Sequence, residues 1–262
     1  MLSRLVVQLS KRSLSTLPKN FSETFQKNGI AIVNGFLSEK QVEEMRRDVD
    51  DVVEKFDINA HRSVFDTYKQ NHASKDDQFL ASSDTVQYFL EKEALDENGN
   101  LTVSKERAIN KIGHGLHIDR PTFKKNTFTS KAVEIGKTLG FSKPAVVQSM
   151  YIFKQPKIGD EVVAHQDATF LYVNPPDRLF GIWIALHDAD RHNGCLWYVP
   201  GSHKHGIIDN TRFVRSKDEK TGDISLKFTG PWPMKTDDMH WEPAEVKAGD
   251  AVIIHGLVIH KR

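Results

Sequence analysis

The chain has 262 residues, of which 39% are hydrophobic and 27% are charged, and this composition excludes disorder throughout. The net charge of +1, without a dense basic stripe, excludes the electrostatic footprint of a nucleic-acid binder. A single cysteine, Cys195, excludes an intramolecular disulfide framework. No apolar run reaches the roughly 18 residues of a transmembrane helix. We therefore expect one folded domain and a monomer, with no nucleic-acid partner and no transmembrane segment.

Residues 1–19 differ in composition from the rest of the chain. They contain four basic residues, and the first acidic residue of the chain is Glu23. Apolar residues at helical spacing complete an amphipathic, acid-poor pattern that is typical of a mitochondrial transit peptide. We predict a targeting leader over 1–19 and a mitochondrial location, with an unrelated basic leader and a cytoplasmic or peroxisomal location as alternatives. The folded domain is then expected over 20–262.

The first part of this domain carries mainly helix signals. Residues 22–29 read as a short helix that ends at Gly29, and the β-rich run 30–33 follows. Ser38 and Gln41 form the pattern of a capping box, which predicts a second helix. Its apolar face should pack on a sheet and consists of Val42, Met45, Val49, Val52 and Val53. Residues 57–82 and 94–105 are polar or rich in turn residues, so we expect loops there.

The second part of the domain carries mainly strand signals. Short β-rich runs alternate with Pro, Gly and Asp, and they cover residues 145–153, 180–185, 196–199 and 251–254. Strands at this spacing indicate a β-sandwich or a jelly roll rather than repeated βαβ units. The fold class that we predict is mainly β with flanking helices.

Three His-x-Asp/Glu pairs could contribute to a metal site: His117 with Asp119, His165 with Asp167, and His240 with Glu242. Two histidines and one carboxylate bind a non-haem Fe(II) ion and leave positions open for a co-substrate and O2. His165 and Asp167 follow the β-rich Val162-Val163, and alternate residues of an extended segment share a face. A distant third ligand is available in His260. We therefore expect iron at His165, Asp167 and His260.

His255 is the rival of His260 for the third position. If residues 251–260 form one extended run, then positions 255 and 260 face opposite sides, and only one of them can reach the metal. We expect His255 to be a hydrogen-bonded core histidine. The alternative for all these histidines is an ordinary place on the surface or in the core.

Five segments resemble the phytanoyl-CoA dioxygenase family, and the resemblance extends over residues 20–262. They are Asn110–His114, Val147–Pro156, His165–Ala168, Asn193–His203 and Ile253–Lys261. The resemblance implies a double-stranded β-helix, which is a jelly roll of the cupin type. It also implies a dioxygenase that uses Fe(II), O2 and 2-oxoglutarate to hydroxylate a small-molecule substrate, either an acyl-CoA or another compound.

The resemblance also implies roles for individual residues. His165, Asp167 and His260 match the iron ligands. The positions that match the 2-oxoglutarate site are Lys111, Met150, His165, Gln166, Asp167 and Trp183. A lysine would supply charge for a dicarboxylate, and Met150 and Trp183 would supply apolar walls.

The sequence departs from the family pattern at its end. Family members continue past the distal histidine with a serine and an arginine that contact 2-oxoglutarate, whereas this chain ends at Arg262. We expect a jelly roll that is truncated at the C-terminal strand, with weak or absent turnover, as a fragment or an alternative isoform. Two other functions remain open: a catalytically silent metal-binding jelly roll, and a zinc hydrolase that uses the same ligands.

Overall fold

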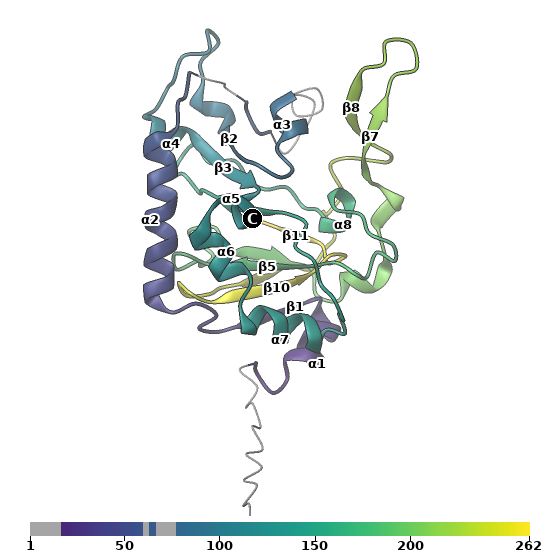
Figure 1. Ribbon diagram of the computed structural model, residues 1–262. Helices are drawn as coiled ribbons and strands as arrows, with labels where there is room; N and C mark the ends of the chain where they lie inside the picture. Colours follow the sequence, from purple (N-terminus) through teal and green to yellow (C-terminus); the bar gives the residue numbers. More distant parts are fainter. Residues whose placement is uncertain (1–16, 60–62, 67–76) are drawn as a thin grey trace, which may run out of the picture.

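The structure is a computed structural model that describes residues 17–59, 63–66 and 77–262 (Figure 1). The helices are α1 (Phe21–Asn28), α2 (Glu39–Lys55), α3 (Asp77–Ala81), α4 (Lys105–Ala108), α5 (Leu116–Asp119), α6 (Pro121–Thr127), α7 (Ser130–Thr138) and α8 (Asp167–Phe170). The described residues also contain the short 3-10 helices η2 (Lys92–Ala94), η3 (Ser202–His205) and η4 (Ile208–Asn210). Every helix in the described residues is too short or too polar to cross a membrane.

Within the part of the chain that the structure describes, the strands form three three-stranded sheets and one hairpin, and all these strand pairings are antiparallel. The sheet orders are β1-β10-β5, β11-β6-β9 and β2-β3-β4, and β7 pairs with β8. The strands are β1 (Ile30–Val33), β2 (Val86–Leu90), β3 (Ile109–His114), β4 (Ser149–Ile152), β5 (Phe180–Ile184), β6 (Leu196–Tyr198), β7 (Phe213–Lys217), β8 (Ile224–Phe228), β9 (Glu242–Ala244), β10 (Ala251–His255) and β11 (His260–Lys261).

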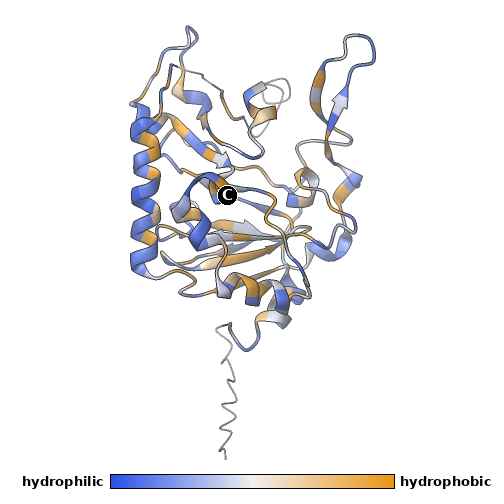
Figure 2. Ribbon diagram, in the orientation of Figure 1, coloured by the Kyte–Doolittle hydropathy of each residue, from blue (hydrophilic) through white to orange (hydrophobic). Residues whose placement is uncertain are grey.

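The β1-β10-β5 sheet is covered on both faces. Val252 and Ile254 of β10 pack in one apolar cluster with Leu196 and Tyr198 of β6, so this cluster fills the space between two sheets. The alternate residues of β10 pack in a second cluster that includes the apolar face of α2. A strand with both faces buried is expected to be apolar, and the first four residues of β10 are apolar and buried. Figure 2 shows this difference: β10 is mainly orange, whereas α2 carries both colours.

The N-terminal elements follow the sequence closely. Helix α1 ends at Asn28 and is capped by Gly29, whose φ of 84° is a left-handed conformation that glycine adopts without strain. Helix α2 begins after Ser38, and the predicted capping box is present. Its predicted apolar face is confirmed, since Val42, Met45, Val49 and Val53 are buried and Val52 is partly buried. Both predicted helices and the strand between them are therefore confirmed.

Two expectations about local structure were inaccurate. The predicted loop over 57–82 contains α3, and the strand predicted from residue 145 begins only at Ser149, because the residues before it pair with no strand in the described chain. Residues 1–16 of the predicted leader lie outside the described residues. Leu17, inside the predicted 1–19 segment, is buried in the core with Phe21 and Phe25.

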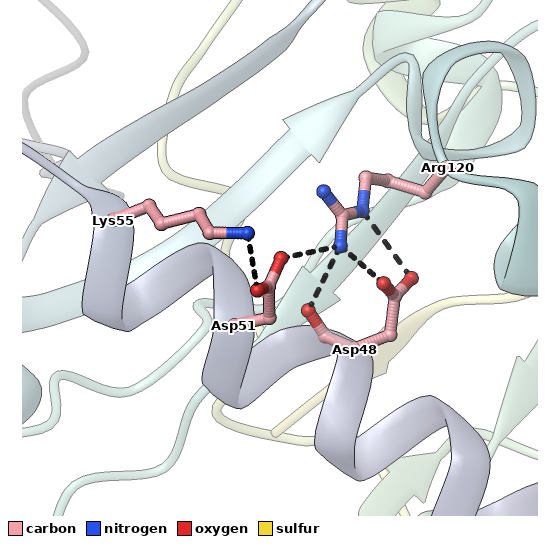
Figure 3. Close-up of polar contacts among 4 residues, drawn as sticks. All are labelled: Asp48, Asp51, Lys55 and Arg120. Atoms are coloured by element: carbon pink, nitrogen blue, oxygen red, sulfur yellow. Dashed lines mark hydrogen bonds and ion pairs between the residues drawn. The ribbon is translucent and has the colours of Figure 1, made fainter.

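Arg120 connects α2 to the α5–α6 region through two carboxylates. Its guanidinium donates to Asp48 and, at 3.0 Å, to Asp51, which also pairs with Lys55 (Figure 3). The exposed fractions of the Arg120 and Asp48 side chains are 25% and 12%, so this pair is shielded from water more than an ordinary surface pair. The network fixes α2, which covers one face of the central sheet.

We expect Arg120→Ala to lower the free energy of unfolding by about 1–3 kcal/mol, between the values typical of exposed and buried ion pairs. Urea unfolding measures this change. The matched control is Lys125→Ala, because Lys125 is 67% exposed and pairs with Glu44 at 3.4 Å. The control should lose less than about 1 kcal/mol. Equal losses in both variants would contradict a special role for Arg120.

Candidate metal centre

The backbone brings His165 and His260 together directly. Each residue donates its N–H to the carbonyl of the other, at 2.9 and 3.0 Å, in an antiparallel bridge. The same ladder continues between Val162 and Arg262, which also exchange two hydrogen bonds. The ring centroids of the two histidines are 4.2 Å apart. Two residues far apart in sequence are thus held side by side by main-chain bonds.

Asp167 completes the cluster from the first position of α8. Its Oδ1 lies 3.5 Å from His165 Nε2 and 3.7 Å from His260 Nε2. One ligand atom from each of the three residues lies within 4.8 Å of the others, and in the described chain this is the one such group of three or more. The prediction that 165–167 is extended was inaccurate, because the chain turns into α8 at Asp167. The turn still directs the carboxylate toward both imidazoles.

Hydrogen bonds set the tautomers of both histidines. His165 Nδ1 lies 2.8 Å from the carbonyl of Val163, and His260 Nδ1 lies 3.1 Å from the carbonyl of Val258. A carbonyl only accepts, so each Nδ1 carries the proton and each Nε2 keeps a lone pair directed at Asp167. This support of a ligating imidazole through its other nitrogen is typical of metal sites.

Electrostatics favour the forms that bind a cation. Burial, with the neighbouring His165, lowers the pKa of His260 to about 4, so its imidazole is neutral at physiological pH. Burial opposes ionisation of the Asp167 carboxyl, but the adjacent imidazoles of His260 and His165 outweigh it and hold the pKa of this carboxyl below its usual range. The site therefore offers two imidazole nitrogens and one carboxylate, a donor set that fits Fe(II) or Zn(II).

The other histidine pairs lie elsewhere. His117 Nδ1 is 2.7 Å from Ser149 Oγ, and the carboxylate of Asp119 accepts the N–H of Val86. His240 is 84% exposed, and Glu242 accepts the hydroxyl of Tyr198 at 3.0 Å. Neither pair has a third ligand within reach among the residues that the structure covers.

His255 is a partly buried histidine with a hydrogen-bonded ring, outside the metal cluster. Its Nδ1 accepts the N–H of Leu257 at 3.1 Å, and its ring packs against Phe25 and His203. Burial lowers its pKa to about 4. The reason given from the sequence was wrong, because β10 ends at His255 and a turn separates it from His260 in β11.

The predicted 2-oxoglutarate residues fall in two places. Lys111 and Met150 lie on one face of the β3–β4 pair, because Met150 is opposite Gly113 and alternate residues of a strand share a face. Trp183 lies on the same face of β5 as Gly181, where a Cβ would be 3.5 Å from Asp167 Oδ2. Trp183 therefore shares its face with the metal cluster. Contact of these residues with 2-oxoglutarate stays a prediction.

Gln166 is buried, and its amide bonds to the protein itself. Its Nε2 donates to the carbonyls of Gly206 and Leu257, and its Oε1 accepts the N–H of Ile208. These bonds join the His165–Asp167 segment to the loop before β7 and to the turn before His260. The observed partners of the Gln166 amide are backbone groups that hold the His165–Asp167 segment in place, and its contact with 2-oxoglutarate stays a prediction.

Lys111 occupies an aromatic cage. Its Nζ lies 3.2 Å from the ring centroid of Phe65 and within 6 Å of the rings of Phe79 and Phe89. The cage provides cation–π contacts but no counter-ion among the described residues. Burial lowers the pKa of Lys111 to about 7. The sequence did not predict the cage, because its rings come from three separate segments.

Comparison with known proteins agrees with this geometry. The model of the phytanoyl-CoA dioxygenase (PhyH) family matches residues 25–261. A phytanoyl-CoA dioxygenase domain-containing protein 1 homolog of Caenorhabditis elegans is 45% identical over 240 residues, which cover 91% of this chain and 83% of that protein. The Bos taurus phytanoyl-CoA dioxygenase domain-containing protein 1 is 43% identical, and the match covers 91% of this chain and 82% of that protein.

Solved structures show the same fold at low sequence identity. The non-heme alpha ketoglutarate dependent carbocyclase SnoK is 21% identical, with a TM-score of 0.58 over 94% of this chain and 77% of that one. EctD from S. alaskensis, solved with 2-oxoglutarate and 5-hydroxyectoine, is 14% identical. Its TM-score is 0.58, and the match covers 95% of this chain and 71% of that one. The predicted jelly roll with flanking helices is confirmed by these neighbours. By its sequence and its fold, the chain belongs to the phytanoyl-CoA dioxygenase (PhyH) family.

Proposed function

We propose that this protein is an Fe(II)- and 2-oxoglutarate-dependent dioxygenase that hydroxylates a small-molecule substrate. The observation that carries the proposal is the convergence of His165 Nε2, His260 Nε2 and Asp167 Oδ1 on one point. Three ligands on one side of a metal leave positions for a bidentate co-substrate and O2. Membership of the PhyH family and the 2-oxoglutarate in related folds support the same cofactors.

The roles of the protein's own residues follow from their surroundings. The two histidines and Asp167 would hold iron, and Gln166 and the backbone bridge keep these ligands in place. Bound iron with 2-oxoglutarate and O2 would supply the oxidising chemistry, in which the co-substrate is decarboxylated to succinate and the substrate is hydroxylated. Lys111 would attract a carboxylate of the co-substrate, and Trp183 would form an apolar wall beside the metal.

The test is an anaerobic titration of the purified chain with Fe(II) and 2-oxoglutarate. The expected result is a visible charge-transfer band of the iron chelate in the natural chain, which disappears in His165→Ala. The matched control, Lys143→Met at an exposed lysine, should keep the band. Absence of a band in the natural chain would refute the proposal and favour a silent protein or a zinc enzyme. Phytanoyl-CoA, the compound in the relatives' names, is the first substrate to test for turnover.

If Lys111 binds a carboxylate of 2-oxoglutarate, affinity should depend on pH. The pKa of the free lysine is about 7, and a bound anion favours the protonated form, so the pKa rises in the complex. Affinity is then highest below pH 7 and falls above it, by up to about tenfold per pH unit. Calorimetric titration of 2-oxoglutarate across this range measures the effect. Lys111→Met should bind more weakly and lose the pH dependence, whereas a natural chain with constant affinity would contradict the role.

A further inference from the structure

An aromatic cluster connects the metal centre to the β7–β8 hairpin. The ring of Phe170 in α8 lies 5.9 Å from the ring of His165, and it also contacts Phe213, Phe228 and Trp232 at 5.6, 6.0 and 5.4 Å. Phe228 and Trp232 are stacked at 4.5 Å with their planes 7° apart. All four aromatic side chains are only partly buried. The cluster is thus an apolar surface beside His165 of the candidate metal centre rather than a sealed core.

The register of the hairpin extends this surface outward. Residues directly opposite each other share a face, and so do alternate residues of one strand. The face that begins with the aromatic pair therefore consists of Phe213 with Phe228, Arg215 with Leu226, and Lys217 with Ile224. At about 3.4 Å per residue, Arg215 is about 7 Å and Lys217 about 14 Å beyond the aromatic pair. An apolar base is followed by two cations.

This face is directed toward α3. Arg215 Nη2 lies 3.4 Å from the carbonyl of Leu80 in α3, and Figure 1 shows the hairpin and α3 at the same end of the molecule. Arg215 and Lys217 are exposed, and neither forms an ion pair with any residue that the structure describes. The carboxylate of Asp218 at the tip accepts two backbone N–H groups of the turn. Lys217 and the remaining N–H groups of Arg215 are therefore available to a ligand.

Two functions of these cations can be distinguished. Charged side chains on an exposed hairpin prevent pairing with other chains, and that role needs no particular face. Recognition of a ligand requires the cations on the face that carries the aromatic rings, where Arg215 and Lys217 lie. Lys227 lies on the other face, opposite Val214, and provides a matched comparison.

We propose that the β7–β8 hairpin recognises the substrate as an amphipathic anion. The aromatic cluster holds the apolar part near the metal, and Arg215, with Lys217 beyond it, binds a carboxylate or phosphate about 7–14 Å from the aromatic pair. This proposal rests on the proposed function, because it assigns the substrate class of the same site. Arg215 and Lys217 are specificity-determining residues and take no part in the chemistry.

The test compares two probes that differ only in charge, 6-phenylhexanoate and 6-phenylhexan-1-ol. Their binding to the full chain is measured by calorimetry at low ionic strength, in EDTA, so that no metal binds the carboxylate. We expect the carboxylate to bind at least about tenfold more tightly, since charge-assisted bonds to arginine are strong. Arg215→Gln should remove this preference and leave the affinity for the alcohol unchanged. Lys227→Gln should keep the preference, and Phe228→Ala should weaken both probes.

Other results would overturn the proposal. It fails if neither probe binds, if both bind equally, or if Arg215→Gln and Lys227→Gln have the same effect. It also fails if Arg215→Gln weakens both probes alike, because Arg215 would then only connect the hairpin to Leu80. The iron chelate band, recorded on the same variants, tests the proposed function separately. A normal band with equal probe binding rejects only the hairpin, and a missing band with a charge preference that Arg215→Gln removes rejects only the dioxygenase.

Discussion

Asp167→Ala is expected to lower the affinity for Fe(II) by at least about 100-fold, the upper end of the loss caused by removing an outer-shell partner of a metal ligand. Asp167 supplies the one carboxylate of the cluster, and its Oδ1 lies 3.5 and 3.7 Å from the two imidazole nitrogens. Without it, the metal would retain two neutral ligands and no protein charge to offset its own. Anaerobic titration with Co(II), followed by visible absorption, measures the loss.

The control for this experiment is His240→Ala. His240 belongs to one of the alternative His-x-Glu pairs and is 84% exposed, so its removal should change neither affinity nor stability. Unfolding in urea shows whether Asp167→Ala still folds. If Asp167→Ala folds and binds Co(II) as tightly as the unsubstituted chain does, the metal binds elsewhere. If His240→Ala loses affinity for Co(II), the choice of His165 and Asp167 as the metal-binding pair is wrong.

The second large effect is expected at Gly256, in the turn between His255 and His260. A Cβ at this position would lie 2.7 Å from Cβ and 2.8 Å from Cγ of Leu179, a buried side chain. The backbone of Gly256 accepts the N–H of Ala168 and donates to Leu179, both at 2.8 Å. Gly256→Ala should therefore lower the free energy of unfolding by about 1–3 kcal/mol, as overpacking does. It should also weaken Fe(II) binding, because Ala168 adjoins Asp167.

Gly181→Ala is the matched control for this substitution. A Cβ at Gly181 would lie 3.5 Å from Asp167 Oδ2 and 3.9 Å from Ile254, which is ordinary van der Waals contact. We expect a stability change within about 0.5 kcal/mol. Urea unfolding and Co(II) titration of both variants provide the comparison. If Gly256→Ala is as stable as Gly181→Ala, the close packing of the turn against Leu179 is not rigid.

The sequence alone determined the local elements and the class of the fold. The capping box at Ser38 and Gln41, the glycine at the end of α1 and the apolar run of β10 each carry a local physical signal. The three expected metal ligands could also be named from the sequence. Spacing reduced the candidates to three pairs, and the family resemblance supported His165, Asp167 and His260.

Only the tertiary structure decided how these ligands meet. His165 and His260 are partners in one backbone bridge, and no local pattern encodes a pairing between segments so far apart in sequence. For the same reason, the sequence revealed neither the aromatic cage of Lys111 nor the Phe170 cluster, whose rings come from separate segments. Gln166 matched a position of the 2-oxoglutarate site in the family. In the structure its side-chain amide forms hydrogen bonds with three backbone groups. Local propensity acts over a few residues, whereas burial and long-range pairing determine what each side chain contacts.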